Sequence, residues 1–182
     1  LTCGLPQVTD VVPRGASRDE ALVLAAALEQ NSEHPLARAI VAEAGAGELP
    51  GVMKFKALPG HGVEGEVNGR KLRLGSPAWL GLETDPMVGE LQRAGKTVVV
   101  LADAGGVLAL LAIADALRPT SRAAVALLRD RGIRVVMLTG DNAATAAAIA
   151  AEAGIGEFRA GILPGDKAAA LAELKVDGSV VA

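Results

Sequence analysis

The sequence predicts an α/β protein built from two different halves: an antiparallel-sheet α+β lobe, then a lobe whose parallel sheet is wound with helices. Asn68-Gly69 and Gly105-Gly106 each separate two strand-like runs, as hairpin turns do, because such residues tolerate positive φ. After Asp115, helical and strand patterns alternate with short connections, which indicates a parallel sheet. The 182 residues are 51% apolar, enough to bury a core.

Two helices open the first half, over residues 18–30 and 35–44. Pro35 suits the first turn of the second helix, which puts His34 at or beside its N-cap. An antiparallel sheet follows, because the next runs alternate or are continuously apolar and are joined by the two glycine turns. The predicted strands are 52–58, 62–67, 70–75, 97–102 and 107–113.

The second half begins at DALRP, where Pro119 opens the next helix. We expect a hinge over residues 115–119, with a second tether near residues 8–11, and rigid lobes at a variable angle. The predicted elements are helix 121–132, strand 133–138, helix 143–154, strand 157–161, helix 164–175 and strand 179–182.

Composition excludes several functions. Acidic and basic residues are interspersed at a net charge of -3, without the basic stripe that nucleic acid or an anionic membrane requires, so no nucleic-acid partner is expected. One cysteine forms no internal disulfide, and with two histidines it is too little for a metal cage, so no metal ligands are assigned. LTCGLPQVTD does not look like a signal peptide. A monomer in a reducing cytosol is expected.

The longest apolar stretch, residues 98–117, is VVVLADAGGVLALLAIADAL. A membrane-spanning helix needs about 20 consecutive apolar residues. Asp103, the glycine pair and Asp115 divide this stretch into short pieces, so it indicates a hairpin of buried strands instead.

A candidate phosphate site lies where RVVML runs into Thr139, Gly140, Asp141 and Asn142 before an alanine-rich helix. Open α/β sheets bind ligands at the carboxyl ends of their strands. The Thr139 hydroxyl can donate to a phosphoryl oxygen, Gly140 lets the backbone approach closely, and Asp141 suits a metal ion, a water or a hydroxyl. The alternative is that Asp141 or Asn142 only caps the helix.

Lys167, in GILPGDKAAAL, lies near the start of the helix that follows the next strand. In a parallel sheet the two loops are neighbours, so we expect Lys167 and Thr139 to face one anion. A solvated surface lysine is the alternative.

The first half offers a candidate site for a purine. Histidine is an unusual N-cap, since Ser, Thr, Asp and Asn are preferred there. The His34 ring can stack on a purine, and Glu29 can accept from an exocyclic amine; a solvent-facing histidine is the alternative. Gly60 and Gly62, in PGHGVEG, flank a strand start and admit a flat or anionic ligand to the backbone, unless they only form a bulge or a tight turn.

These motifs carry a family resemblance that covers nearly the whole chain. TGDN after one strand, LPxDK after the next and DxLRP before both resemble the haloacid-dehalogenase-like phosphorylation domain of P-type ATPases. SEHPLARAI and GHGVEG resemble the nucleotide-binding domain of heavy-metal (P1B) transporters. LTCGLPQVTDV is similar to the sequence that directly follows the family's DKTGT motif. The resemblance implies a phosphorylation-domain stub over 1–10, a nucleotide-binding domain over 11–114, and part of the phosphorylation domain over 115–182.

The resemblance also implies ATP and Mg²⁺ as cofactors. ATP would dock in the first lobe, and Thr139, Gly140 and Lys167 would bind phosphoryl oxygens while Asp141 places Mg²⁺ or the nucleotide. The family's phosphorylated aspartate would precede Leu1, and its GDGxND motif would follow Ala182, so residues 1–182 alone are expected to be inactive. The implied adenine-nucleotide contacts are Glu29, His34, Gly60, Gly62 and Gly75.

Two substitutions should test these contacts. His34→Gln and Gly62→Arg are expected to weaken a nucleotide affinity in the micromolar to millimolar range, about 4 to 8 kcal/mol, without unfolding the lobe.

By the same resemblance, the partners are transmembrane and actuator domains of one polypeptide, and the chain is a cytoplasmic domain of a membrane protein, in a bacterial inner membrane. EFRAGILPGDK is more similar to zinc, cadmium, lead or cobalt exporters than to copper exporters, which stay an alternative.

Two other classes stay open. A haloacid-dehalogenase-like phosphatase with a cap domain would need an early DxD motif, whereas the only early aspartate is Asp10, with no second aspartate two residues on. A non-catalytic nucleotide-binding regulator would have no use for Thr139 or Lys167.

Overall fold

The computed structural model describes residues 1–162, 164–166, 169 and 171–172. Its contacts divide the chain into unit 1, Leu1–Arg118, and unit 2, Pro119–Ala182. The division falls inside the segment 115–119 in which the sequence predicts a hinge. Residues 1–10, which the resemblance assigns to the phosphorylation domain, cluster with unit 1. The predicted domain boundaries stay a prediction.

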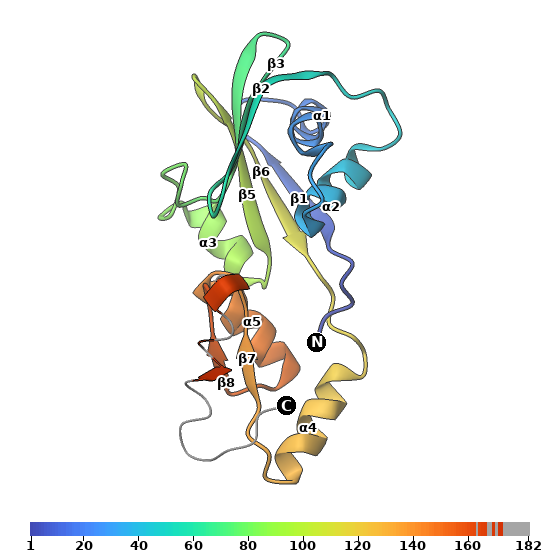
Figure 1. Cartoon of the computed structure of the whole chain (residues 1–182), viewed down its shortest axis with the longest axis vertical. Coiled ribbons are helices and arrows are strands. Elements are labelled where there is room, and N and C mark those ends of the chain that lie inside the picture. The colour runs from blue at the N-terminus through green and yellow to red at the C-terminus, as the bar shows by residue number, and fades with distance from the viewer. Residues whose placement is uncertain (163, 167–168, 170, 173–182) are drawn as a thin grey trace. The chain divides into compact units, whose positions relative to one another are not determined.

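Unit 1 contains a six-stranded antiparallel sheet with the strand order β1-β6-β5-β4-β3-β2 (Figure 1). The antiparallel lobe predicted from the sequence is confirmed. Its helices are α1 (Arg18–Glu29), α2 (Pro35–Ala44) and α3 (Pro86–Arg93). Its strands are β1 (Gln7–Pro13), β2 (Val52–Leu58), β3 (Gly62–Val67), β4 (Arg70–Gly75), β5 (Thr97–Asp103) and β6 (Gly106–Ala114).

Helices cover both faces of this sheet (Figure 1). The larger core lies between α1, α2 and one face, where Leu28, Ile40 and Leu101 are fully buried. A smaller core on the other face joins α3 to Val98 and Leu110. The central strands β5 and β6 are therefore buried on both sides, which is why they form a nearly continuous apolar run. No helix among the described residues has the length and apolarity to cross a membrane.

Turn chemistry sets the strand register. Asn68 and Gly69 have φ of 50° and 76°, so they form the predicted type I′ turn between β3 and β4. The turn between β5 and β6 is at Ala104-Gly105, one residue earlier than predicted, where the Gly105 amide donates to Asp103 Oδ1 at 2.7 Å.

Two elements of unit 1 were missed by the sequence analysis. β1 pairs with β6, about a hundred residues later in the chain, and its local pattern is short and mixed, so only the distant partner defines it. The signal for α3 was present, because Asp85 caps it and Pro86 occupies its first turn. Arg14, which follows β1, forms an ion pair of 2.8 Å with Asp85.

Unit 2 alternates helices and short strands: α4 (Ser121–Asp130), β7 (Val136–Leu138), α5 (Ala143–Ala153), β8 (Glu157–Arg159) and the 3-10 turn η1 (Pro164–Asp166). β7 and β8 pair in parallel, as predicted. Strand β7 is shorter than the predicted 133–138, because Ile133 is exposed and Arg134 reaches to an ion pair with Glu157. The predicted strand 179–182 and most of the predicted helix 164–175 lie outside the described residues.

Candidate functional site

The loop at residues 139–142 joins the carboxyl end of β7 to α5. Backbone hydrogen bonds tie it to the segment that follows β8: the Thr139 amide donates to the Arg159 carbonyl at 3.0 Å, and the Ile162 amide donates to the Thr139 carbonyl at 3.0 Å. The Gly161 amide also donates to the Asp141 carbonyl at 2.8 Å. The parallel pair thus places the two strand ends side by side, where α/β folds bind anions.

Asn142 is the N-cap of α5, and its Oδ1 accepts from the amides of Ala144 and Thr145 at 3.0 and 3.1 Å. Asp141 is therefore not used for capping. Its Oδ2 accepts from the Thr139 hydroxyl at 2.6 Å, and its amide donates back to Thr139 Oγ1 at 3.2 Å. To donate to a phosphoryl oxygen, the Thr139 hydroxyl would have to give up its hydrogen bond to Asp141 Oδ2.

Lys167 lies outside the described residues, so its expected position opposite Thr139 stays a prediction. Within the described part of the chain, no cluster of three His, Cys, Asp or Glu side chains could hold a metal ion. Asp141 nevertheless fits a Mg²⁺ that is shared with a nucleotide, because Mg²⁺ usually takes one or two protein carboxylates together with substrate phosphates and water.

The cap assignment can be tested by stability. Asn142→Ala is expected to lower the free energy of unfolding of unit 2 by about 1 to 2 kcal/mol, since two amides lose their acceptor. Asp141→Asn keeps an acceptor for Thr139 and should cost less. Thermal unfolding followed by circular dichroism makes the comparison, and an equal or larger loss for Asp141→Asn would contradict the assignment.

In unit 1, Glu29 is the last residue of α1. Among the described residues, its Oε2 is the only buried side-chain nitrogen or oxygen without a hydrogen-bond partner. Burial raises the pKa of the Glu29 carboxyl, and the side chains of Ser32 and His34 offset part of that increase. A buried acceptor with no partner is costly in the free protein, and a ligand donor can satisfy it.

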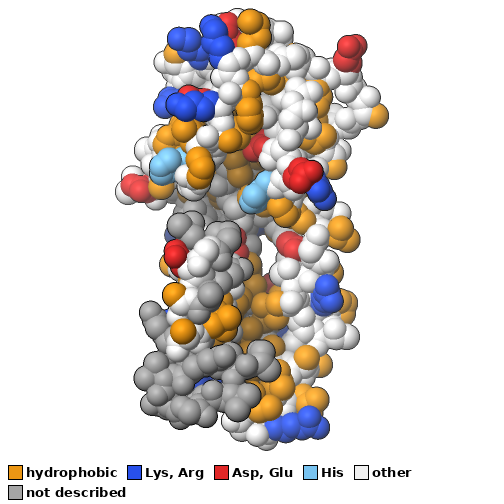
Figure 2. Space-filling view, viewed as in Figure 1, with side chains coloured by type: hydrophobic (Ala, Val, Ile, Leu, Met, Phe, Trp, Pro, Cys, Tyr) orange, Lys and Arg blue, Asp and Glu red, His pale blue; other side chains and the backbone are white. Residues whose placement is uncertain are grey.

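His34 is the N-cap of α2, as the sequence predicts, and its Nδ1 accepts from the Leu36 amide at 3.2 Å. From the sequence, histidine is an unusual choice for an N-cap, and the structure shows that the ring does cap the helix. The cap requires Nδ1 to be unprotonated, so in the neutral ring Nε2 carries the proton and can donate. His34 is exposed, and Figure 2 shows both histidine side chains of the chain on one face.

The three glycines proposed as nucleotide contacts differ in why the structure has glycine at their positions. Gly60 has φ of 78°, and a Cβ there would meet nothing within 4 Å, so its open side can receive a ligand. Gly62 pairs with Gly75 across β3 and β4, and a Cβ on Gly62 would lie 2.2 Å from the Leu74 carbonyl oxygen. A Cβ on Gly75 would lie 2.3 Å from the His61 carbonyl oxygen. Close strand packing alone requires glycine at 62 and 75.

This geometry corrects one expectation. Gly62→Arg was expected to weaken nucleotide binding without unfolding the lobe. That expectation is wrong, because any side chain at this position collides with the backbone of β4.

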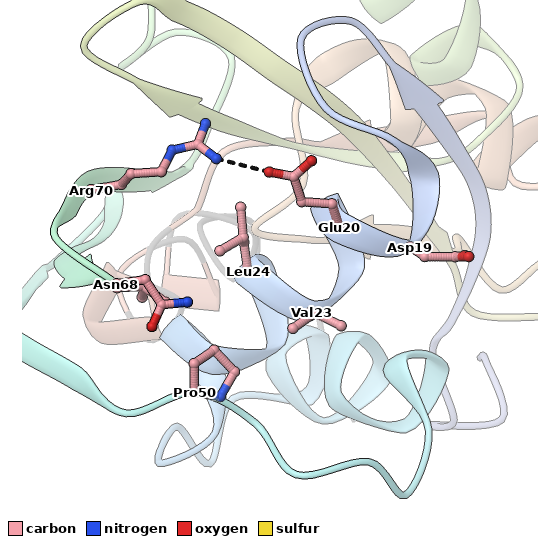
Figure 3. Close-up of a pocket in the computed structure, with 8 residues that line it drawn as sticks. Asp19, Glu20, Val23, Leu24, Pro50, Asn68 and Arg70 are labelled. Atoms are coloured by element: carbon pink, nitrogen blue, oxygen red, sulfur yellow. Dashed lines mark hydrogen bonds and ion pairs between the residues drawn. The ribbon is translucent and has the colours of Figure 1, made fainter.

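Two surface cavities lie away from these residues. One, of about 360 Å³, is lined by Val23, Leu24, Pro50 and Val67, with Glu20 and Arg70 directed toward one another at its rim (Figure 3). The other, of about 420 Å³, lies over charged side chains of β3 and β4. Arg70 is held by Glu20 and Asp103, both at 2.8 Å. Neither cavity is lined by Glu29, whose Oε2 is the buried acceptor without a partner.

Asp10 has a structural role. It lies in β1, accepts from the Thr9 hydroxyl at 2.7 Å and forms a close ion pair with Lys96. The hydrogen bond from Lys96 lowers the pKa of the Asp10 carboxyl. This strand belongs to the antiparallel sheet, not to the parallel pair that carries the Thr139 loop, which argues against Asp10 as a phosphatase nucleophile.

Unit 2 has a parallel β-α-β arrangement with a TGD loop at a strand end, and a separate α+β unit precedes it, as in haloacid-dehalogenase-type hydrolases that carry a second lobe. The chain belongs to the haloacid dehalogenase-like hydrolase family, whose model matches residues 1–182. It is 46% identical over 181 residues to copper-exporting P-type ATPase B of Archaeoglobus fulgidus, and 44% identical over 183 residues to the zinc/cadmium/lead-transporting P-type ATPase of Escherichia coli. Each match covers 96% of this chain but only 26% and 24% of the relatives, so the chain spans about a quarter of their length.

Solved structures agree. A zinc-transporting PIB-type ATPase in its E2.Pi state superposes with a TM-score of 0.66 at 41% identity, over 97% of this chain and 30% of that one. The catalytic CPx-ATPase domain CopB-B gives a TM-score of 0.69 at 25% identity, over 98% of this chain and 64% of that one. The predicted resemblance to heavy-metal P-type ATPases is confirmed.

Proposed function

We propose that this chain is the ATP-binding part of a P1B-type ATPase, which couples ATP hydrolysis to export of a heavy-metal cation. The observation that carries the proposal is the buried, unpartnered Oε2 of Glu29, on the helix that directly precedes the His34 cap. An exocyclic amine of adenine is a donor of the kind this acceptor lacks. The relatives, which are named as metal-transporting P-type ATPases, support the same conclusion.

Within unit 1, Glu29 would accept from the adenine amine, and the His34 ring would stack on the purine or donate to it through Nε2. Gly60 would let the nucleotide approach the backbone on its open side. Gly62 and Gly75 keep β3 and β4 close together and so shape the turn next to Gly60. Their contribution to nucleotide binding is indirect, because close packing of the two strands requires glycine at both positions.

Within unit 2, the Thr139 hydroxyl and the Gly140 backbone would bind phosphoryl oxygens, together with Lys167. These groups would offset the negative charge that develops during phosphoryl transfer. Asp141 would hold Mg²⁺, whose chemistry is to neutralise phosphate charge. The aspartate that receives the phosphoryl group lies, on this proposal, outside residues 1–182.

The transported ion is proposed as a heavy-metal cation without a narrower choice. The resemblance of EFRAGILPGDK suggests a zinc, cadmium, lead or cobalt exporter, but the named relatives give no support for cobalt. The relatives named for copper and for zinc, cadmium and lead have nearly equal identities, 46% and 44%, so copper export is an equal alternative. The chain would act as the cytoplasmic part of a bacterial inner-membrane protein, with transmembrane and actuator domains as its partners in the same polypeptide.

His34→Asn tests the nucleotide site, because asparagine is a better helix cap than histidine but has no imidazole ring. We expect the melting temperature to be unchanged or higher, while the affinity for Mg-ATP, measured by calorimetry, falls about tenfold. His34→Ala is the matched control, since it removes both ring and cap and should also cost about 1 kcal/mol of stability. Unchanged ATP affinity in His34→Asn would overturn the assignment of His34.

A second test concerns chemistry. The polypeptide of residues 1–182 is expected to form no acid-stable phosphoenzyme with γ-labelled ATP, because covalent transfer needs a carboxylate nucleophile in line with the γ-phosphate. Thr139 and Lys167 would bind and orient the phosphoryl group, but neither can replace the missing carboxylate nucleophile. Labelling that disappears in Asp141→Asn would show instead that Asp141 is the nucleophile, and would favour the phosphatase alternative.

A further inference from the structure

His61 lies between Gly60 and Gly62, in the turn that joins β2 to β3, and its imidazole ring stacks on the indole of Trp79. The ring centroids are 6.2 Å apart and the ring planes differ by 15°. This separation is within the range of offset-stacked aromatic pairs. His61 is exposed and Trp79 is half-buried, so the imidazole covers part of the indole.

Backbone contacts join the same two segments. The Ser76 amide donates to the His61 carbonyl at 2.8 Å, and the Trp79 amide donates to Ser76 Oγ at 3.3 Å. Gly75 lies under the indole, since a Cβ there would be 2.7 Å from Trp79 Cε3. The absence of a side chain at Gly75 therefore makes room for both the indole and the His61 turn.

The turn is closed by one backbone hydrogen bond of its own, from the His61 amide to the Leu58 carbonyl at 2.9 Å, and the contacts with Ser76 and Trp79 add to it. Gly60 and Gly62 both have positive φ, and glycine loses more conformational freedom on ordering than any other residue. A loop that is already fixed in its binding conformation loses less entropy when the ligand binds. The stack and the Ser76 hydrogen bond supply such a restraint from the β4 side of the turn.

We propose that His61 and Trp79 are positioning residues, which hold the Gly60–Gly62 turn ready for the nucleotide. The proposal rests on the nucleotide site proposed above, but it assigns to these side chains a role through the turn and not through contact with the nucleotide. Trp79 is the only tryptophan in the chain, so its fluorescence reports on the stack directly.

The test uses the 182-residue chain with His61→Ala, which removes the stack, and His61→Phe, which keeps a flat ring on the indole. Calorimetry with Mg-ATP should give a dissociation constant raised about 3- to 10-fold in His61→Ala and changed by less than about twofold in His61→Phe. Trp79 emission should shift in His61→Ala alone. Hydrogen exchange without nucleotide should be faster at the Ser76 amide in His61→Ala, and unchanged in His61→Phe.

The outcomes separate the two proposals. Unchanged ATP affinity and unchanged Ser76 exchange in His61→Ala would overturn the positioning role. Equal loss of affinity in His61→Ala and His61→Phe would mean that the imidazole contacts the nucleotide itself, and would also overturn it. If the unaltered chain binds no ATP, the proposed nucleotide site is wrong. Faster Ser76 exchange in His61→Ala would then show only that the stack restrains the turn, and the proposed role in nucleotide binding would be overturned as well. Trp79→Phe, which keeps an aromatic ring over Gly75, should bind ATP almost normally, whereas Trp79→Leu should behave like His61→Ala.

Discussion

Gly62→Ala is expected to destabilise unit 1 by about 3 kcal/mol or more. The new Cβ would lie 2.2 Å from the Leu74 carbonyl oxygen and 2.5 Å from Gly75 Cα. Both are backbone atoms, so no side-chain rotation can relieve the overlap. The φ of 152° adds strain of its own for an L-residue.

Gly60→Ala is the matched control, two residues away in the same turn. Its φ of 78° is also positive, but its Cβ would meet nothing within 4 Å. We expect it to cost about 1 kcal/mol, from backbone strain alone. Urea unfolding, followed by Trp79 emission and by circular dichroism, gives both values. Equal midpoints for the two variants would show that β3 and β4 can separate at Gly62 without cost.

Glu29→Gln is expected to change stability and nucleotide affinity in opposite directions. The free protein holds the buried Glu29 Oε2 without a partner, and burial disfavours the charged form of this carboxyl, so a neutral amide in its place should raise the free energy of unfolding by about 1 kcal/mol. The affinity for Mg-ATP should fall about tenfold or more, because the amide is a weaker acceptor for the adenine amine.

The pH dependence follows from the raised pKa of the Glu29 carboxyl. The folded state holds this proton at pH values where the unfolded state has already lost it, so between the two pKa values the stability contributed by Glu29 falls as pH rises. Glu29→Gln should remove that part of the pH dependence. Glu48→Gln makes the same chemical change at an exposed position and should alter neither property. Parallel losses of stability and affinity in Glu29→Gln would mean that Glu29 is structural.

The site residues show how far local patterns reach. The TGDN loop was found from its position between an apolar strand and a helix, and the structure adds that Asn142 serves as the cap, leaving Asp141 to pair with Thr139. The histidine before Pro35 was found as a cap position, but its ring hydrogen bond was not expected. The stacking of Trp79 on His61 could not be predicted from the local sequence, because the two residues are eighteen positions apart.

Local sequence was sufficient for elements whose determinants are neighbours in the chain. The Asn68-Gly69 turn, the bounds of α2 and the buried hairpin of β5 and β6 follow from φ preferences, from proline in a first helical turn and from apolar runs that need no distant partner. These features define the antiparallel lobe and, with the alternation after Asp115, the fold class.

Only the tertiary structure decided what depends on distant contacts. β1 forms a strand because its backbone pairs with β6, far away in the sequence. Gly62 and Gly75 must be glycine because the backbones of β3 and β4 lie too close together there for a Cβ atom. The Oε2 atom of Glu29 is left without a partner because burial removes water from it and the fold brings no donor to that oxygen. Burial and close approach are properties of pairs of segments, so a pattern along one segment cannot contain them.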